Sequence, residues 1–144
     1  MTRRDVDKLH EELEALFTDL WRGPRYLASR RGFRPNVDSF HTDDPHKLTV
    51  VVELPGVDPE SIVVVVGERM LVIAGEHSRP KADGRVYQQM EIEYGPFQRQ
   101  VRLHEDVDPE QAHAEYERGI LRISLPVSDS PAMRGRVAVT VQLA

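Results

Sequence analysis

Leu48-Thr-Val-Val-Val-Glu-Leu54 is the stretch that decides the fold, because every second side chain in it is apolar. Side chains two residues apart point to the same face of a β-strand, so one face of this segment is suited to burial. The residues on that face are Leu48, Val50, Val52 and Leu54. Leu121-Arg-Ile-Ser-Leu125 has the same alternation. We therefore predict two core strands at these positions.

Further short runs of β-type residues, separated by turn residues, occur on both sides of these two. Their regular spacing is typical of an antiparallel sandwich. They are Val37–His41, Ile62–Val66, Met70–Gly75, Arg85–Glu91, Phe97–Leu103, Ala112–Tyr116 and Val137–Val141, and the second core strand extends over Ile120–Leu125. We predict an all-β fold, an immunoglobulin-like antiparallel β-sandwich over residues 37–127.

Part of this pattern occurs twice, fifty residues apart. Val57-Asp-Pro-Glu60 returns as Val107-Asp-Pro-Glu110, and Leu71 and Ile73 have counterparts in Leu121 and Ile123. Each copy predicts an Asp-capped helical turn, with Pro in its first position, followed by a strand hairpin. Gly119 is suited to the positive φ of the second hairpin bend. Two similar hairpins could face each other across the sandwich, although a shared turn motif can also arise by chance.

The segments outside the sandwich have a different composition. Residues 5–21 place apolar side chains at three- and four-residue spacing, which predicts an amphipathic helix that Gly23-Pro24 ends. We expect a mobile linker up to residue 36, so residues 1–36 form an N-terminal arm. Ser128–Arg136 is polar and contains Gly and Pro, which predicts a flexible C-terminal extension over residues 128–144.

Composition excludes several classes of protein. The chain has 144 residues, enough for one core, and its net charge is −5. Residues 1–36 carry eight Lys/Arg and six Asp/Glu, which leaves eleven and eighteen for the rest, and this acidic body argues against nucleic-acid binding. Without cysteine there is no disulfide or thiol nucleophile. The longest apolar run, Ile62–Val66, is too short to span a bilayer, and the first residues lack a signal peptide, so we expect a cytoplasmic protein without membrane association.

No motif indicates catalysis. Gly-x-Ser-x-Gly, a phosphate-binding loop and His-Glu-x-x-His do not occur, so we expect no enzyme and no cofactor. His41, Asp44 and His46 are close in sequence, but a turn rich in Asp and His is more often solvated than ligating, and we expect no metal. The arginines of residues 22–34, with Tyr26 and Phe33 among them, could bind nucleic acid or an acidic membrane surface, yet a solvated linker is the favoured interpretation.

Three motifs in order resemble the α-crystallin domain of small heat-shock proteins of the bacterial type, over about Pro35–Val127. They are the Leu-Pro-Gly-Val turn in Glu53–Val57, the aromatic-x-Arg strand Phe97–Leu103 and the signature Ala114-Glu-Tyr-Glu-Arg-Gly-Ile-Leu121. Arg118 departs from the Asn or Asp usual before the glycine, and Ile120 replaces Val. The loss of Asn slightly strains a bend with positive φ, but leaves Gly119 to carry it.

The resemblance implies an ATP-independent holdase chaperone that binds unfolding proteins and prevents their aggregation, and that assembles into a homo-oligomer. Dispersed apolar surface on the N-terminal arm would bind many clients. The client-binding residues that we expect are Leu13, Leu16, Phe17, Leu20, Trp21, Tyr26 and Phe33. The alternative is a co-chaperone-like β-sandwich adaptor that binds one folded partner.

The resemblance also implies a strand-exchanged dimer, in which a loop strand pairs with the partner's sandwich. The expected interface residues are Arg85, Val86, Tyr87, Gln88, Gln89 and Arg99. Arg99 stands where the family has an arginine linked with the dimer interface or an acid, so we expect it to be paired and partly buried. An ordinary exposed strand arginine is the alternative.

A C-terminal apolar plug that docks on a neighbouring subunit is the last implied feature. Its residues here would be Val137, Val139 and Val141. The alternative is a last strand paired within its own sandwich. The alternation of Ile62–Val66 leaves Val63 and Val65 facing away from the core, and we expect this apolar strip to be the groove for the plug or for a client, or else to be buried within one subunit.

Overall fold

The structure is a computed structural model and describes residues 33–67, 69–129 and 135–144. These residues belong to one compact unit, Gly32–Ala144, which includes the predicted C-terminal extension. The predicted helix at 5–21 and the expected client-binding residues from Leu13 to Tyr26 lie outside the described residues.

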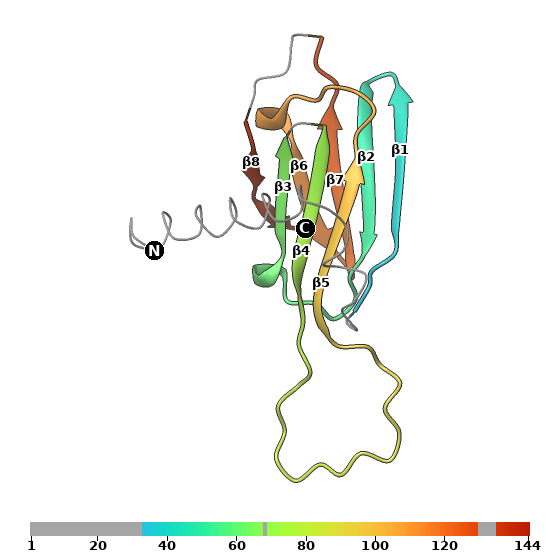
Figure 1. Cartoon of the computed structure of the whole chain (residues 1–144), viewed down its shortest axis with the longest axis vertical. Helices are drawn as coiled ribbons and strands as arrows, with labels where there is room; N and C mark the ends of the chain where they lie inside the picture. Colours follow the sequence, from blue (N-terminus) through green and yellow to red (C-terminus); the bar gives the residue numbers. More distant parts are fainter. Residues whose placement is uncertain (1–32, 68, 130–134) are drawn as a thin grey trace, which may run out of the picture. The chain divides into compact units, whose positions relative to one another are not determined.

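Two β-sheets pack face to face (Figure 1). The first has the order β1 (Val37–Asp43), β2 (His46–Glu53), β7 (Ile120–Pro126), β6 (His113–Glu117) and β9 (Val141–Leu143). The second has the order β5 (Gly95–Arg102), β4 (Met70–His77), β3 (Val63–Gly67) and β8 (Val137–Val139). All pairs are antiparallel except β6 with β9, which is parallel. The predicted antiparallel sandwich is confirmed.

The alternating residues of β2 and β7 form the centre of the core. Val50 lies opposite Ile123, and Val52 lies opposite Leu121, and all four are at most 1% exposed. Val64, Val66, Leu71 and Ile73 supply the facing layer from β3 and β4. Burial of one such side chain contributes about 1.5–3 kcal/mol relative to exposure, so this row of apolar residues holds the two sheets together.

The fifty-residue repeat corresponds to a repeated structure. Asp58 accepts a hydrogen bond from the Glu60 amide at 3.0 Å, and Asp108 accepts one from the Glu110 amide at 3.1 Å. Each aspartate caps a single 3₁₀ turn, Pro59–Ser61 (η1) or Pro109–Gln111 (η2), and each turn precedes a hairpin. The hairpins β3–β4 and β6–β7 lie in opposite sheets, so the predicted pair of facing hairpins is confirmed.

Both hairpin bends use positive backbone φ. Gly119 has φ +80, as predicted, and a Cβ there would lie 3.0 Å from the Cα of Pro55. Arg118 before it has φ 51, and Arg69 in the β3–β4 bend has φ 59. Such values cost energy for residues with a side chain, so both arginines are held in an unfavoured backbone conformation.

One predicted strand is wrong for the single chain. Arg85–Glu91 lies within the loop of residues 78–94, which joins β4 to β5 and extends beyond the end of the sandwich (Figure 1). Residues 85–91 are all exposed. The physical reason is that a strand needs a partner edge to satisfy its backbone N–H and C=O groups, and the described part of the chain supplies none to this segment.

Candidate assembly surfaces

The two sides of the sandwich differ in the length of their edge strands. On one side the edges are β8, which pairs with β3, and β9, which pairs with β6, and each has only three residues. On the other side, β1 and β5 are the outermost strands in the described part of the chain (Figure 1). An outermost strand presents unpaired backbone groups that can pair with another chain. Strand addition is therefore possible along β1 and β5.

The C-terminal valines lie beside the inner row of β3. Val139 pairs with Val64, and Val137 pairs with Val66, whereas Ala138 pairs with Val65. Val137, Val139 and Val141 are half-buried and pack against the core cluster. The expected groove residues Val63 and Val65 therefore lie on the opposite face of the sheet from these valines, because cross-strand partners share a face and the valines share the inner one.

Val63 and Val65 both lie on the outer face of β3, where Val63 is half-buried and Val65 is 3% exposed. The structure contains a single chain, and in it the last strand pairs within its own sandwich. Docking of the valines on a neighbour stays a prediction.

Gly67 lets the C-terminal segment approach β3 closely. A Cβ at this position would lie 2.9 Å from the Cα of Arg136 and would clash with the carbonyl oxygen of Gly135. The glycine at the end of a valine-rich strand is thus explained by a contact with a segment about seventy residues away in sequence. The sequence alone does not indicate this role, because Gly at a strand end also signals an ordinary turn.

Arg99 anchors the beginning of the domain to β5. Its Nη1 donates a hydrogen bond of 2.6 Å to the carbonyl oxygen of Pro35, and the side chain is half-buried. Burial lowers the pKa of Arg99, and the nearby charge of Arg34 lowers it further. The prediction of a paired, partly buried arginine agrees with this geometry, but the partner is a backbone carbonyl of the same chain instead of an acid. Its place in a dimer interface stays a prediction.

Phe33 is held in an aromatic cluster with His77 and Phe97. Its ring centroid lies 5.0 Å from that of His77 and 5.7 Å from that of Phe97, both in edge-to-face geometry. Edge-to-face pairs of this kind add to the stability gained by burying the rings. Phe33 therefore packs on the sandwich, and a side chain that is packed in this way is a poor candidate for binding clients.

A second set of ring contacts holds the base of the loop. The ring of Tyr94 lies 4.7 Å from His77, and the guanidinium of Arg79 stacks 4.6 Å from the Tyr94 ring and 5.3 Å from the Tyr87 ring. Hydrogen bonds from Arg85 and then Arg79 lower the pKa of Tyr87. The contacts of Tyr94 hold the base of the loop near the sandwich, whereas the contact between Arg79 and Tyr87 lies within the loop.

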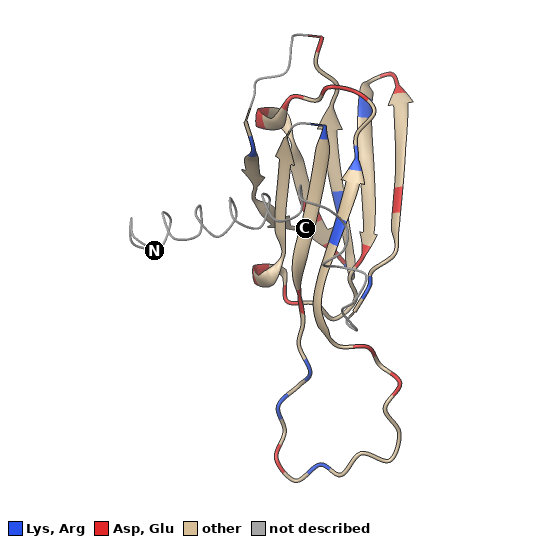
Figure 2. Cartoon of the chain, in the orientation of Figure 1, with Lys and Arg blue, Asp and Glu red and all other residues tan. Residues whose placement is uncertain are grey.

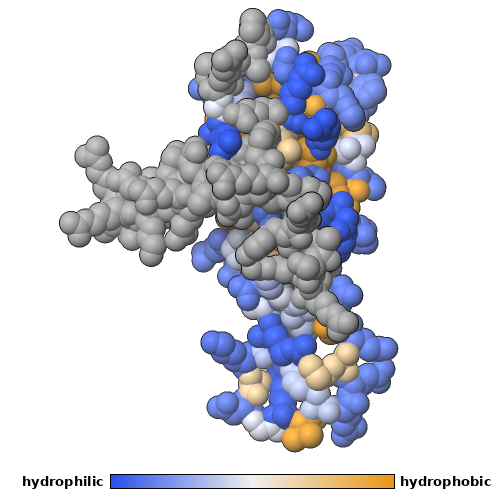
Figure 3. Space-filling model, viewed as in Figure 1, coloured by the Kyte–Doolittle hydropathy of each residue, from blue (hydrophilic) through white to orange (hydrophobic). Residues whose placement is uncertain are grey.

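The loop exposes apolar side chains along its length. Val86 is 89% exposed, Met90 58% and Ile92 65%. Figure 3 shows apolar surface at this end of the molecule among hydrophilic residues. Figure 2 shows the charges of the loop: the limb that leaves β4 carries Arg79, Lys81 and Arg85 together with one acid, Asp83, and the limb that enters β5 carries the acids Glu91 and Glu93. Apolar side chains exposed in this way usually mark a surface that another molecule covers.

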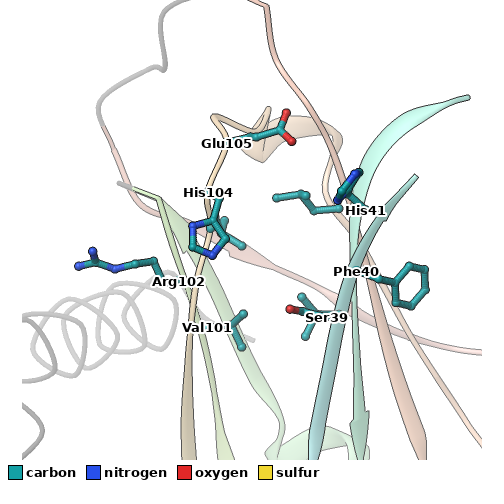
Figure 4. A pocket seen from close by; sticks show the side chains of 10 residues that line it. Ser39, Phe40, His41, Val101, Arg102, His104 and Glu105 are labelled. Carbon is teal, nitrogen blue, oxygen red and sulfur yellow. The ribbon is translucent and has the colours of Figure 1, made fainter. Parts of the chain in front are cut away.

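A narrow cavity of about 130 Å³ opens between β1, β2 and the end of β5 (Figure 4). We call it the side slot. Its apolar lining residues are Phe40, Leu48, Val50, Val101 and Leu103, and its polar ones are Ser39, His41, Arg102, His104 and Glu105. Figure 4 shows Ser39 pointing toward Val101 and Phe40 pointing away.

The histidines near the slot do not form a metal centre. His46 Nε2 lies 2.9 Å from a carboxylate oxygen of Glu105, while His41 Nε2 lies 4.0 Å from Asp43. Within residues 33–67, 69–129 and 135–144, no group of three or more potential His, Cys, Asp or Glu ligands comes together. In these same ranges, no helix has the length and apolar character required to cross a membrane.

The topology, the paired Asp-capped turns and the long loop between β4 and β5 define an α-crystallin-type sandwich. The Hsp20/alpha crystallin family matches residues 41–142. The chain belongs to this family, the family of the small heat-shock chaperones of the stress response.

Individual relatives agree with this assignment. The 18 kDa heat shock protein of Streptomyces albus G is 32% identical over 139 residues, which cover 94% of this chain and 87% of that protein. The small heat-shock protein of Xylella fastidiosa, whose structure is described as a distinct high order structure, is 26% identical with a TM-score of 0.59, over 74% of this chain and 95% of that one. Heat shock protein 16.0 of Schizosaccharomyces pombe has the same fold, with a TM-score of 0.63 at 24% identity, over 74% of this chain and 98% of that one.

Proposed function

We propose that this chain is an ATP-independent holdase that assembles with copies of itself and captures unfolding proteins. The observation that carries the proposal is the exposed apolar loop of residues 78–94 in a chain of the Hsp20/alpha crystallin family, beside a sandwich with a free strand edge. A monomer that leaves these features exposed is suited to self-association. The relatives named as heat-shock proteins support the chaperone role.

Assembly begins with a strand-exchanged dimer. The segment Arg85–Met90 of one copy pairs with the free edge of β1 in a second copy and gains there the backbone partners that it lacks in the single chain. The contact of Arg79 with Tyr94 holds the base of the loop while the segment extends to the partner. We infer that Arg99 supports this dimer indirectly, by fixing the start of the domain through Pro35.

Larger assemblies use the C-terminal valines. In the single chain, β8 pairs with β3. In the assembly, β8 of a neighbouring subunit takes this place on β3 after the chain's own β8 has left it. The valines are only half-buried, and valine fills less volume than isoleucine, so this contact is weak enough to exchange. Heat would loosen such contacts and expose apolar surface when clients also unfold.

Client binding is assigned to the arm, from Leu13 to Tyr26, without Phe33. The full chain with Phe17→Ser and Trp21→Ser should then protect a heated client poorly, because the apolar stripe loses its two aromatic rings. Glu12→Ser with Asp19→Ser, on the polar face of the predicted helix, is the matched control and should protect normally. Equal protection by both variants would contradict the assignment of client binding to the arm.

The alternative, a co-chaperone-like adaptor for one folded partner, makes a different prediction about size. An adaptor of this kind would be monomeric, whereas the holdase forms a large assembly. Size-exclusion chromatography with light scattering separates the two. A second comparison uses assemblies locked by chemical cross-linking, which should lose protection if clients bind the surface that dissociation exposes, and should retain it if they do not.

A further inference from the structure

We propose that the side slot is the binding site for the apolar face of the exchanged loop from a second copy of this chain. Val86, Met90 and Ile92 would then line one face of the incoming strand and close the slot, with one of them inserted into the cavity. The inference rests on the proposed strand exchange, and adds to it the face of the strand, the side chains and the pocket.

The slot is open because β1 offers too little apolar cover. In the β1–β2 pair, Ser39 lies opposite Val50, and His41 lies opposite Leu48, so their side chains share the face that looks toward β5. A serine and a histidine at these positions leave Leu48 and Val101 only half-buried. At the other end of the same side, the Arg99 hydrogen bond to Pro35 closes the sandwich. The core is therefore accessible through the slot, next to the outer edge of β1.

The size of the slot suits one apolar side chain. A cavity of about 150 Å³ lined by aliphatic residues can hold a benzene molecule, so 130 Å³ accepts the side chain of a Met or an Ile. None of the residues that line the slot belongs to the loop of the same chain. The loop extends beyond the sandwich, and Val86 is 89% exposed, so its apolar face is not covered by its own domain (Figure 1).

The alternation of the loop determines which face enters. If residues 85–92 are extended, one face carries Val86, Gln88, Met90 and Ile92, and the other carries Arg85, Tyr87, Gln89 and Glu91. When a strand pairs with β1, its residues opposite Ser39 and His41 place their side chains on the same face as those two residues, which is the face of the slot. A shift by one residue would bury Arg85 and Glu91 against Leu48 and Val101, which is strongly unfavourable for charged groups. The apolar face is the one that the slot can accept.

A matched pair of substitutions tests the face of the strand. Met90→Lys places a charge on the face that enters the slot, and Gln89→Lys places the same charge on the opposite face. We expect Met90→Lys to weaken dimerisation by about tenfold or more and Gln89→Lys by less than about twofold, measured by sedimentation velocity over a dilution series. An equal effect of the two substitutions, or a larger effect of Gln89→Lys, would overturn the proposal.

A cross-linking experiment tests the same face independently of the strand register, because the chain contains no cysteine of its own. Ser39→Cys is combined in turn with a cysteine at each loop position from 85 to 92, and the full chain is mildly oxidised. Disulfide-linked dimers should form with cysteine at 86, 88, 90 or 92 and not at 85, 87, 89 or 91. Cross-links through the second set alone would overturn the slot and leave strand exchange in place. A chain that remains monomeric would overturn both.

Discussion

Replacement of Val137 and Val139 by glycine tests how the C-terminal strand stabilises the sandwich. Both valines are half-buried beside Val64 and Val66, which are 1% and 0% exposed. Full burial of a valine contributes about 1.5–3 kcal/mol, so each half-buried one contributes about 1 kcal/mol. Glycine within a strand costs roughly a further 0.5–1 kcal/mol per position. The double variant should therefore lose about 3–4 kcal/mol of unfolding free energy.

Urea unfolding followed by far-ultraviolet circular dichroism measures this loss. With a dependence of about 1–3 kcal/mol per molar urea, the midpoint should fall by at least about 1 M. Ala138→Gly in the same strand is the matched control: its side chain is exposed, so only the backbone cost remains. Equal midpoints for the two variants would refute the packing of β8 on the core. Light scattering of the same samples should show smaller assemblies for the double variant, and an unchanged size would refute the docking of the valines on a neighbour.

Three further substitutions test separate contacts. Arg118→Asn should raise the unfolding free energy by about 0.5–1 kcal/mol, because asparagine tolerates the positive φ that arginine does not, and an unchanged or lower urea midpoint would contradict this. Arg99→Ala should lower the unfolding free energy by about 1.5–3 kcal/mol at most, since it removes a charged hydrogen bond to the Pro35 carbonyl, and Arg99→Lys should recover part of the loss. Asp106→Asn tests a pH dependence: the hydrogen bond from Arg69 holds the pKa of Asp106 below its usual value. The pair therefore stabilises the folded state above the usual carboxyl pKa, and this contribution disappears as the pH falls through the lower folded-state pKa. The variant should melt below the parent at pH 7 and together with it near pH 2, and parallel melting curves at all pH values would exclude this role.

The sandwich could be predicted because its signals are local. The alternation of Leu48–Leu54 reports a strand with one buried face, and the Asp-Pro repeats report capped turns, regardless of what lies on the other side of the core. The structure confirms both, down to the positive φ of Gly119. Gly119 does not carry this bend alone, because Arg118 before it also has a positive φ.

The surfaces that depend on distant segments could be predicted only in part. Arg85–Glu91 has the composition of a strand, but its partner edge is not in the same domain, so in the single chain it is a loop. Val137–Val141 was expected as one strand and forms two, because the chain passes from the edge of β3 to the edge of β6 at Thr140. The side slot results from Ser39 and His41 meeting Val101 across two sheets, and no spacing along the sequence predicts such a meeting.

The central claim is that this chain prevents the aggregation of unfolding proteins without nucleotide. Light scattering of a heated model client, with and without the full chain and with no ATP present, measures this directly. Scattering should fall in proportion to the amount of chain added, and the client should be retained in a complex that elutes ahead of both components. Undiminished scattering at a molar excess of the chain would contradict the claim.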